Sequence, residues 1–276
     1  MISGKTTIIG HIGYPTFAFK APLIYNPWFE HKGIDAVVVP MGVRSEHYED
    51  FFRCAFSMTN IRGALVTMPH KVTTTRLVDE LTPIAAVAGA ANAVLLREDG
   101  RTVGDQFDGA GFVRGVQRKG FELTGRRALV VGNGGVGSPI AASLAGAGVA
   151  HMGLFDPNAD ASHSLAARLE EHFPKLEVVT GSKDPAGYDI VVNATPLGMN
   201  DDDPLPMDVD RIDPSTFVGE VVMKQEITPF LAAAQERGCQ IQVGSDMLFE
   251  MIPAYLEFFG FGTATPDELR AVSTLA

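Results

Sequence analysis

A glycine-rich turn in the middle of the chain has the composition of a phosphate-binding loop. Its six residues are Gly132-Asn133-Gly134-Gly135-Val136-Gly137. A strand-like apolar run (127–132) leads into the turn, and a helical pattern of small residues (138–148) follows it. In this setting the first glycine permits a tight turn, the second lets the backbone approach a pyrophosphate, and the third lets the helix pack against the strand. The turn therefore predicts dinucleotide binding, with the phosphates at the helix N-terminus.

An acidic residue, Asp156, ends the next strand-like run (152–156). A carboxylate at this point can accept hydrogen bonds from both hydroxyls of a cofactor ribose, and it would repel a 2′-phosphate. The four residues after it, Pro157 to Asp160, include no arginine that could offset the repulsion. The sequence therefore predicts NAD as the cofactor and makes NADP the less favoured one.

Two polar segments outside this region could supply the groups for chemistry on a carbinol. Hydride transfer at carbon needs a group that moves the hydroxyl proton. One segment, VTMPHK (66–71), is where a buried strand ends in a polar turn. The other, GDQFDG (104–109), is where a hairpin strand leads into the following part of the chain. These segments are the candidates for the reacting groups of an oxidoreductase.

The elements that must position these residues alternate between strands and helices. In the first 108 residues, strand-like runs at 6–10, 36–40 and 63–69 alternate with helical patterns at 22–33 and 48–58, and a hairpin is expected over 92–105. Further strands are expected at 127–132, 152–156, 176–180, 189–196, 217–223 and 239–244. This alternation predicts an α/β fold with mostly parallel sheets. The apolar stretch at 247–259 predicts a helix that packs on more than one side.

Composition limits the classes of function. The chain has 276 residues, 46% of them hydrophobic, which suits two domains with sizeable cores. The formal net charge is −11 and no basic cluster is present, so nucleic acid is not expected as a partner. Cys54 and Cys239 lack the spacing of a disulfide framework or zinc site, and the histidines are dispersed, so no metal is expected. No run of about 20 apolar residues could span a membrane, and we expect a cytoplasmic protein.

Six segments, spread over essentially the whole chain, resemble ordered motifs of the shikimate dehydrogenase family. They are VTMPHK (66–71), GAANAV (89–94), GDQFDGAG (104–111), NATPLGM (193–199), ITPFL (227–231) and GSDMLFEM (244–251). The resemblance implies an N-terminal α/β substrate domain and a Rossmann NAD(P)-binding domain, with the C-terminal helices returning to the first domain. It puts the substrate domain at residues 1–108 and 247–276 and the dinucleotide-binding domain at 109–246.

The same resemblance implies roles for single residues. Lys71 and Asp108 are the expected catalytic pair, in which an ammonium beside a carboxylate donates to a substrate hydroxyl or a developing alkoxide. The sequence is compatible with two roles for Lys71: a general base, or a group that only positions the substrate. The expected substrate-binding residues are Thr67, Asn92, Phe19, Lys20, Ala21 and Met251. The expected cofactor-binding residues are the six of the glycine turn, Asp156, Asn193, Ala194, Thr195, Val221 and Gly244.

Where the family binds its substrate, this sequence departs from the family pattern. The two serines that hold a substrate carboxylate in the family correspond to Phe19 and Ala21, and a glutamine of the last helix corresponds to Met251. These changes remove hydrogen-bonding groups, which predicts altered or broadened substrate choice. Alternatively, Thr16 or Lys20 replaces the serines.

Two functions follow as hypotheses. The first is an NAD-linked dehydrogenase that transfers a hydride between the cofactor and a small cyclic hydroxy acid such as shikimate or quinate, with a homodimer left open. The second is a non-catalytic NAD-binding sensor with the same fold. Retention of Lys71 and Asp108 favours the enzyme, because a sensor needs no proton-transfer pair.

Overall fold

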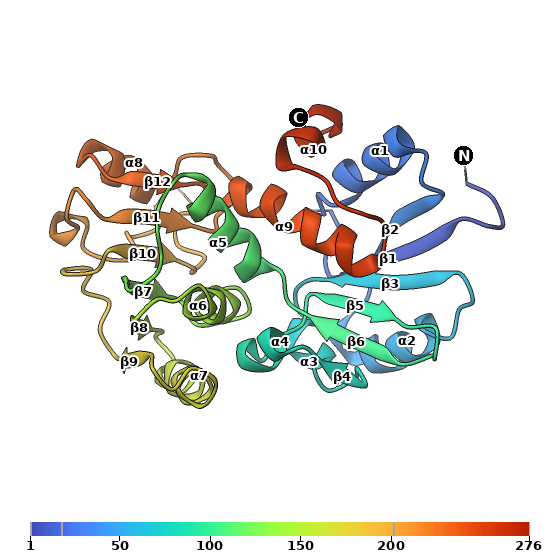
Figure 1. The fold of residues 1–276 in the computed structure, drawn as a ribbon, viewed down its shortest axis with the longest axis horizontal. Coiled ribbons are helices and arrows are strands. Elements are labelled where there is room, and N and C mark those ends of the chain that lie inside the picture. Colours follow the sequence, from blue (N-terminus) through green and yellow to red (C-terminus); the bar gives the residue numbers. More distant parts are fainter. Residues whose placement is uncertain (1, 18, 201, 276) are drawn as a thin grey trace. The chain divides into compact units, whose positions relative to one another are not determined.

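The computed structural model describes residues 2–17, 19–200 and 202–275, and the chain folds as two units, each built around a six-stranded sheet (Figure 1). The first unit comprises Met1–Phe107 and Ile252–Ala276, and the second comprises Asp108–Met251. Helix α9 (Gly244–Phe259) begins in the second unit and ends in the first. Segments from both ends of the sequence therefore build the first unit.

The sheet of the first unit is mixed, with the strand order β2-β1-β3-β5-β6-β4. Its strands are β1 (Thr7–Gly13), β2 (Ala36–Gly42), β3 (Ile61–Val66), β4 (Glu80–Leu81), β5 (Ala93–Leu96) and β6 (Thr102–Asp105). Strand β1 pairs in parallel with β2 and β3, whereas β5 pairs antiparallel with β3 and β6. The hairpin between β5 and β6 is confirmed. Its turn includes Gly100 at φ +84°, a conformation that glycine adopts without steric cost.

Short helices connect these strands. They are α1 (Pro22–Lys32), the 3₁₀ turn η1 (Ser45–His47), α2 (Tyr48–Ala55), α3 (Lys71–Thr74), α4 (Pro83–Ala88) and α10 (Pro266–Val272). The predicted helix 22–33 is confirmed and ends at the left-handed Gly33. Helix α2 ends before the predicted residue 58, because the N–H groups of Ser57 and Met58 donate to carbonyls three residues earlier and close the helix in a tight turn.

The sheet of the second unit is fully parallel, with the strand order β12-β11-β10-β7-β8-β9. Its strands are β7 (Arg127–Val131), β8 (His151–Phe155), β9 (Glu177–Thr180), β10 (Ile190–Asn193), β11 (Phe217–Glu220) and β12 (Gln240–Gln242). Its helices are α5 (Asp108–Arg118), α6 (Gly137–Gly146), α7 (Ala159–His172), the 3₁₀ turn η2 (Val209–Arg211) and α8 (Pro229–Glu236). Numbered from β7, the order is 3-2-1-4-5-6, which is that of a Rossmann sheet. The Rossmann prediction is confirmed.

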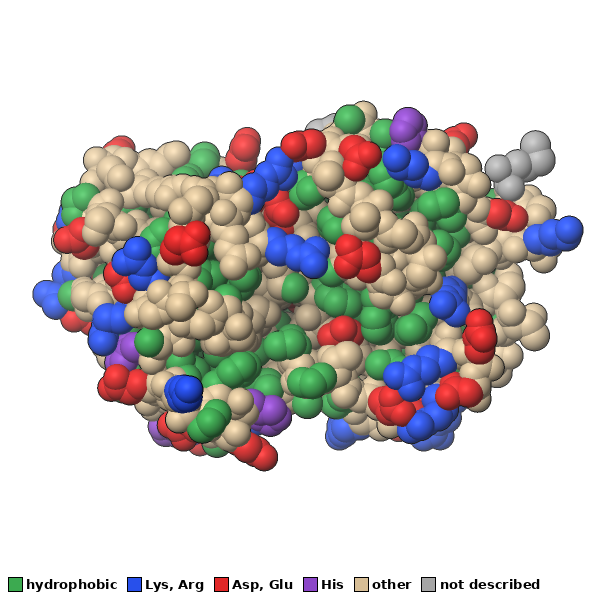
Figure 2. Space-filling view, in the orientation of Figure 1, with side chains coloured by type: hydrophobic (Ala, Val, Ile, Leu, Met, Phe, Trp, Pro, Cys, Tyr) green, Lys and Arg blue, Asp and Glu red, His purple; other side chains and the backbone are tan. Residues whose placement is uncertain are grey.

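Alternation along β1 decides which residues face the core of the first unit. Ile12 packs in a buried cluster with Tyr48 and Phe52 of α2. Because successive side chains of a strand point to opposite faces, His11 lies on the other face of the sheet. On the molecular face shown in Figure 2, basic side chains are interspersed with acidic ones. Among the described residues, no helix is both long and apolar enough to cross a membrane.

Candidate functional site

The glycine turn joins β7 to α6, and its own backbone requires two of its glycines. Gly132 has φ +93°, and a Cβ on Gly137 would overlap the carbonyl oxygen of Gly132. Gly134 and Gly135 are different: both are exposed, and a Cβ on either would meet no atom within 4 Å. No described residue accepts a hydrogen bond from their N–H groups. The turn thus keeps open space and free amide donors beside a helix N-terminus, which fits the pyrophosphate of a dinucleotide.

Asn133 fixes the shape of this turn from inside. Its side chain is 4% exposed, and Nδ2 donates to the carbonyl of Val130 (3.3 Å) while Oδ1 accepts from Oγ of Ser162 (2.7 Å). Its own carbonyl accepts from Oγ of Ser138 (2.7 Å). Both polar ends of the side chain and the backbone carbonyl are therefore bonded within the fold, so Asn133 shapes the turn.

Asp156 is also bonded to the backbone around the turn. Its Oδ2 accepts from the N–H of Asn133 (2.8 Å) and its Oδ1 accepts from the N–H of Asn158 (2.9 Å). Beside it, the Nζ of Lys183 lies 5.9 Å from the ring centroid of Phe155. Lys183 follows β9, the neighbour of β8 in the sheet, so a cation reaches the end of β8 from a loop that the sequence prediction left aside. Strand adjacency was the signal that could have found it.

A buried carboxyl group holds the loop after β10. Glu220 is fully buried, and its Oε2 accepts from Nδ2 of Asn193 (3.1 Å) and Oγ1 of Thr228 (2.9 Å). Burial raises the pKa of Glu220, and the two hydrogen bonds oppose this shift. The Oγ1 of Thr195 donates to Oδ1 of Asn193 (2.6 Å). The start of the NATPLGM loop is therefore tied to the end of β11 and to the N-cap of α8.

The remaining predicted cofactor residues lie beside these loops. The N–H of Ala194 donates to the carbonyl of Val131 (2.8 Å), and a Cβ on Gly132 would lie 2.8 Å from the carbonyl of Ala194. A Cβ on Gly244 would lie 2.9 Å from the carbonyl carbon of Val221. The second unit thus brings Ala194 against the glycine turn and packs Gly244 against the backbone of Val221.

In the first unit, Asn92 joins three segments near Lys71. It is 1% exposed, its Oδ1 accepts from the N–H of Phe107 (2.9 Å), and its carbonyl accepts from the hydroxyl of Tyr255 in α9 (3.3 Å). Lys71 begins α3, and its carbonyl accepts from the N–H of Ala91 (2.9 Å). Asp108, the first residue of the second unit, is 4% exposed and begins α5, one peptide bond after Phe107. Asn92 therefore fixes the backbone that leads into Asp108.

At the end of β1, an aromatic stack occupies the region of the predicted substrate residues. The ring of Phe19 stacks on His11, with centroids 4.0 Å apart and planes 25° apart. A Cβ on Gly13 would meet Cγ2 of Thr67 and, at 3.0 Å, the Phe19 ring, so these residues pack together. Burial, and secondarily the charge of Lys71, lowers the pKa of His11 to about 4. The sequence prediction gave His11 no role, although a histidine inside a buried strand was a usable signal.

The other predicted substrate residues are spread more widely. Lys20 is exposed, and Ala21 takes the N-cap position of α1, where its side chain provides no hydrogen bond. Met251 belongs to the second unit, where a Cβ on Gly111 would lie 2.7 Å from its Cβ. Phe19 therefore stacks on His11 and Thr67 packs at Gly13, whereas Lys20 faces solvent.

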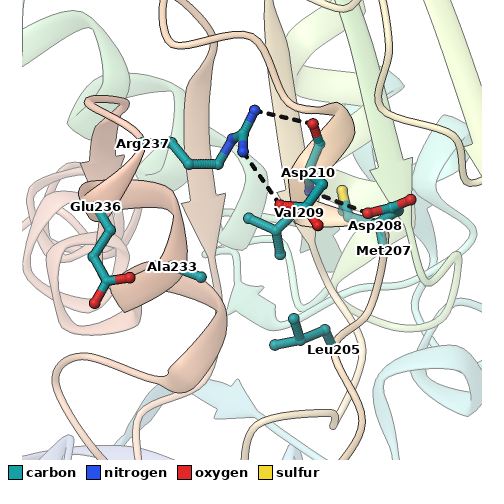
Figure 3. A pocket seen from close by; sticks show the side chains of 8 residues that line it. All are labelled: Leu205, Met207, Asp208, Val209, Asp210, Ala233, Glu236 and Arg237. Carbon is teal, nitrogen blue, oxygen red and sulfur yellow. Dashed lines mark hydrogen bonds and ion pairs between the residues drawn. The ribbon is translucent and has the colours of Figure 1, made fainter.

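A pocket of about 400 Å³ lies in the second unit, between η2 and α8 (Figure 3). It is lined by Leu205, Met207, Asp208, Val209, Asp210, Ala233, Glu236 and Arg237. The guanidinium of Arg237 is already held there by the Asp210 carboxylate (3.3 Å), the Asp210 carbonyl (2.9 Å) and the Ile212 carbonyl (3.1 Å). None of the predicted site residues lines this pocket, so it is not the candidate site. Among the described residues, no group of three or more His, Cys, Asp or Glu side chains could hold a metal.

Comparison with known proteins identifies relatives over almost the full length of the chain. Residues 12–94 match the model of the shikimate dehydrogenase substrate binding domain. The shikimate dehydrogenase (NADP(+)) of Paramagnetospirillum magneticum is 33% identical over 98% of this chain and 99% of its own length. That of Rubrobacter xylanophilus is 36% identical over 90% of this chain and 88% of its own length.

The prediction that NAD is the preferred cofactor is wrong, because the curated relatives are named for NADP(+). The reason lies around Asp156. Each of its oxygens accepts one backbone N–H, so the carboxylate has a structural role in the turn, and its presence alone does not identify a ribose contact. The cation sought among residues 157–160 is instead available from Lys183, which the neighbouring strand carries to Phe155.

Solved structures confirm the predicted fold. The 5-ketofructose reductase of a Gluconobacter strain superposes with a TM-score of 0.88 at 25% identity, covering 98% of each chain. The shikimate 5-dehydrogenase of Listeria monocytogenes, in complex with shikimate and NAD, gives 0.91 at 26% identity, covering 98% of this chain and 97% of that one. The quinate dehydrogenase of Corynebacterium glutamicum, in complex with NAD, gives 0.88 at 25% identity, covering 97% and 98%. With these relatives, the chain belongs to the shikimate dehydrogenase family and is an oxidoreductase that acts on a CH–OH group.

Proposed function

We propose that this protein transfers a hydride between NADP(H) and a cyclic hydroxy acid of the shikimate or quinate class, or a close analogue with altered polar groups. The observation that carries the proposal is the glycine turn, in which Gly134 and Gly135 leave space and amide donors that the fold itself does not use. The names of the curated relatives support NADP(+) and shikimate. The changed residues Phe19 and Ala21 support an altered substrate.

Lys71 and Asp108 act together on the reacting hydroxyl in this proposal. The nicotinamide ring, when bound, accepts or supplies the hydride. The ammonium of Lys71 donates a hydrogen bond to the substrate oxygen and stabilises the alkoxide that develops as hydride leaves carbon. The hydroxyl proton passes to the Lys71–Asp108 pair and from there to solvent, so that oxidation releases one proton and one hydride from the alcohol. Asn92 holds the N–H of Phe107, the residue before Asp108.

Lys183 supplies the positive charge for the cofactor 2′-phosphate. It is exposed, follows β9 and lies over Phe155, one residue before Asp156. We expect Lys183→Ala to weaken NADP⁺ binding by roughly 10-fold and to leave NAD⁺ binding unchanged, because only NADP⁺ carries the extra phosphate. Lys175→Ala is the matched control, since Lys175 is exposed but precedes the same strand. Titration of both variants with both dinucleotides measures this, and equal weakening of NAD⁺ and NADP⁺ would contradict the assignment.

Steady-state assays test the proposed reaction. Wild-type protein with NADP⁺ and either shikimate or quinate should form reduced cofactor. Lys71→Ala should lower the turnover number by roughly 10²- to 10⁴-fold, the range for loss of a proton-transferring group, while NADP⁺ affinity is kept. The opposite result, a wild-type protein that binds NADP⁺ but oxidises no hydroxy compound, would favour a dinucleotide sensor.

A further inference from the structure

His11 is a buried polar side chain whose bonding the protein leaves incomplete. The residue is 9% exposed, and its Nδ1 is buried without a hydrogen-bond partner among the described residues. An unsatisfied buried polar atom is costly, and native proteins rarely keep one without a role. Asn92, whose Nδ2 is likewise buried and unpartnered, follows Ala91, the residue that donates to the Lys71 carbonyl. Two incomplete polar groups therefore lie in the part of the first unit that carries Lys71.

The surroundings of His11 determine which ligand group would suit it. Its pKa of about 4, set by burial and by the charge of Lys71, keeps the imidazole neutral at physiological pH. A neutral imidazole offers one N–H donor and one acceptor, which matches a hydroxyl group. A carboxylate would need two or more donors or a cation, and the Phe19 ring stacked on His11 presents an electron-rich face that repels anions. Lys20, which directly follows Phe19 in sequence, is exposed.

We propose that His11 contacts the substrate, and that the His11–Phe19 stack receives an uncharged, hydroxyl-bearing part of it in preference to a carboxylate. The inference rests on the proposed function, because it takes Lys71 as the group at the reacting hydroxyl. The part of the substrate that meets the stack then carries no charged group. Within the proposed function this selects the analogue: the preferred substrate is an uncharged cyclic polyol or its ketone, and the hydroxy acid with the same ring is the poorer substrate.

Shikimate and its methyl ester separate these cases, because they share the ring and all hydroxyl groups and differ only at the carboxyl group, which is anionic in the acid and an uncharged ester with one added methyl group in methyl shikimate. We expect wild-type kcat/KM to be at least as high for methyl shikimate as for shikimate. We expect Phe19→Ser to shift this ratio toward the acid by roughly 10-fold, because it removes the aromatic face and adds a hydroxyl donor. A wild-type preference of tenfold or more for the acid overturns the inference.

His11 itself is tested by two substitutions. His11→Phe keeps an aromatic ring against Phe19 but removes both nitrogens, and should raise KM for methyl shikimate by roughly 10- to 100-fold with a much smaller change in kcat. His11→Asn restores a donor and an acceptor and should recover most of the loss. A merely structural role would instead lower thermal stability in both variants and leave KM unchanged. An unchanged KM in His11→Phe overturns the assignment.

Binding measurements keep this test separate from that of the proposed reaction. Calorimetric titration with NADP⁺ present gives the dissociation constants of shikimate and methyl shikimate even without turnover. Ester binding without oxidation would defeat the proposed reaction and support the His11–Phe19 inference. Oxidation of shikimate with a kcat/KM at least tenfold above that for the ester would support the proposed reaction and defeat the inference. Binding of shikimate without binding of the ester would also defeat the inference. Failure of both ligands to bind overturns the inference too.

Discussion

His11 should make the first unit sensitive to mild acid. Burial, reinforced by the charge of Lys71, lowers the pKa of His11 from 6.5 to about 4 in the folded protein. In the unfolded chain the same imidazole takes up a proton near its ordinary value. Below pH 6.5 the unfolded state therefore binds more protons than the folded state, and each step toward pH 4 favours unfolding. The stability associated with His11 is fully present above pH 6.5 and is lost as the pH falls through this window.

The size of the effect follows from the shift in pKa. Each unit of difference corresponds to about 1.4 kcal/mol, so the whole window corresponds to about 3 kcal/mol. At pH 5 the unfolded imidazole is almost fully protonated and the folded one is not, which gives about 2 kcal/mol of lost stability relative to pH 7. His11→Phe has no such proton and should lack this part of the acid sensitivity. Carboxyl groups titrate in the same range, but they contribute equally to both proteins and cancel in the difference.

Urea unfolding at pH 7 and pH 5 measures this difference. Trp28, the only tryptophan, is 2% exposed in α1 of the same unit, so its fluorescence reports unfolding where His11 lies. The free energy of unfolding should fall by about 2 kcal/mol more in the wild type than in His11→Phe. The control is His47→Asn, which changes an exposed histidine and should behave as the wild type. A difference under about 0.5 kcal/mol would mean that His11 titrates near its ordinary pKa, and would refute the burial argument.

Further predictions concern three other residues. Lys71→Met should raise the pKa of His11 in an NMR titration, because it removes one cause of the lowering. Gly137→Ala should cost roughly 1–3 kcal/mol in urea unfolding and weaken dinucleotide binding, whereas Gly134→Ala, whose Cβ meets nothing, should weaken binding alone. Glu220 has a raised pKa, so wild-type stability should fall relative to Glu220→Gln as pH rises above 4.5; parallel curves would contradict this.

Local spacing was enough to predict the parts of the fold that depend on neighbours in sequence. The strand, glycine turn and helix around Gly132 could be predicted because their pattern lies within one short segment, in which a Cβ on Gly137 would overlap the carbonyl of Gly132, five residues earlier. The Asp99–Gly100 hairpin is equally local. The predicted helix ends were less accurate. At Ser57 the N–H donates to the carbonyl three residues earlier instead of four, and the sequence carries no clear signal for this change.

The parts that could not be predicted depend on partners distant in sequence. In the sequence, Asp156 is a carboxylate with two oxygens that could accept hydrogen bonds from a ribose. In the folded turn, the backbone N–H groups of Asn133 and Asn158 each donate to one of these oxygens. Lys183 enters the cofactor question only because β8 and β9 are paired. The residues that directly follow Asp156 therefore show neither the backbone hydrogen bonds that this carboxylate accepts nor the cation that comes from the loop after the neighbouring strand. The cofactor prediction was wrong because it left out the backbone hydrogen bonds to Asp156 and the cation near it.

Hydrogen-bond partners and packing contacts also distinguish residues that serve the fold from residues that need a ligand. His70 is buried like His11, but its Nε2 bonds the Val43 carbonyl (2.8 Å) and its ring stacks on Tyr48 at 3.9 Å, so the core alone explains it. His11 has the stack without the hydrogen bond on Nδ1. The carbonyl of Gly132 leaves no room for a side chain at Gly137, whereas none of the residues that the structure describes requires a glycine at 134. In each unit, then, contacts within the fold explain one residue of a pair and not the other: they explain His70 but not His11, and Gly137 but not Gly134. His11 and Gly134 are the positions where a substrate and a cofactor would supply the missing partner.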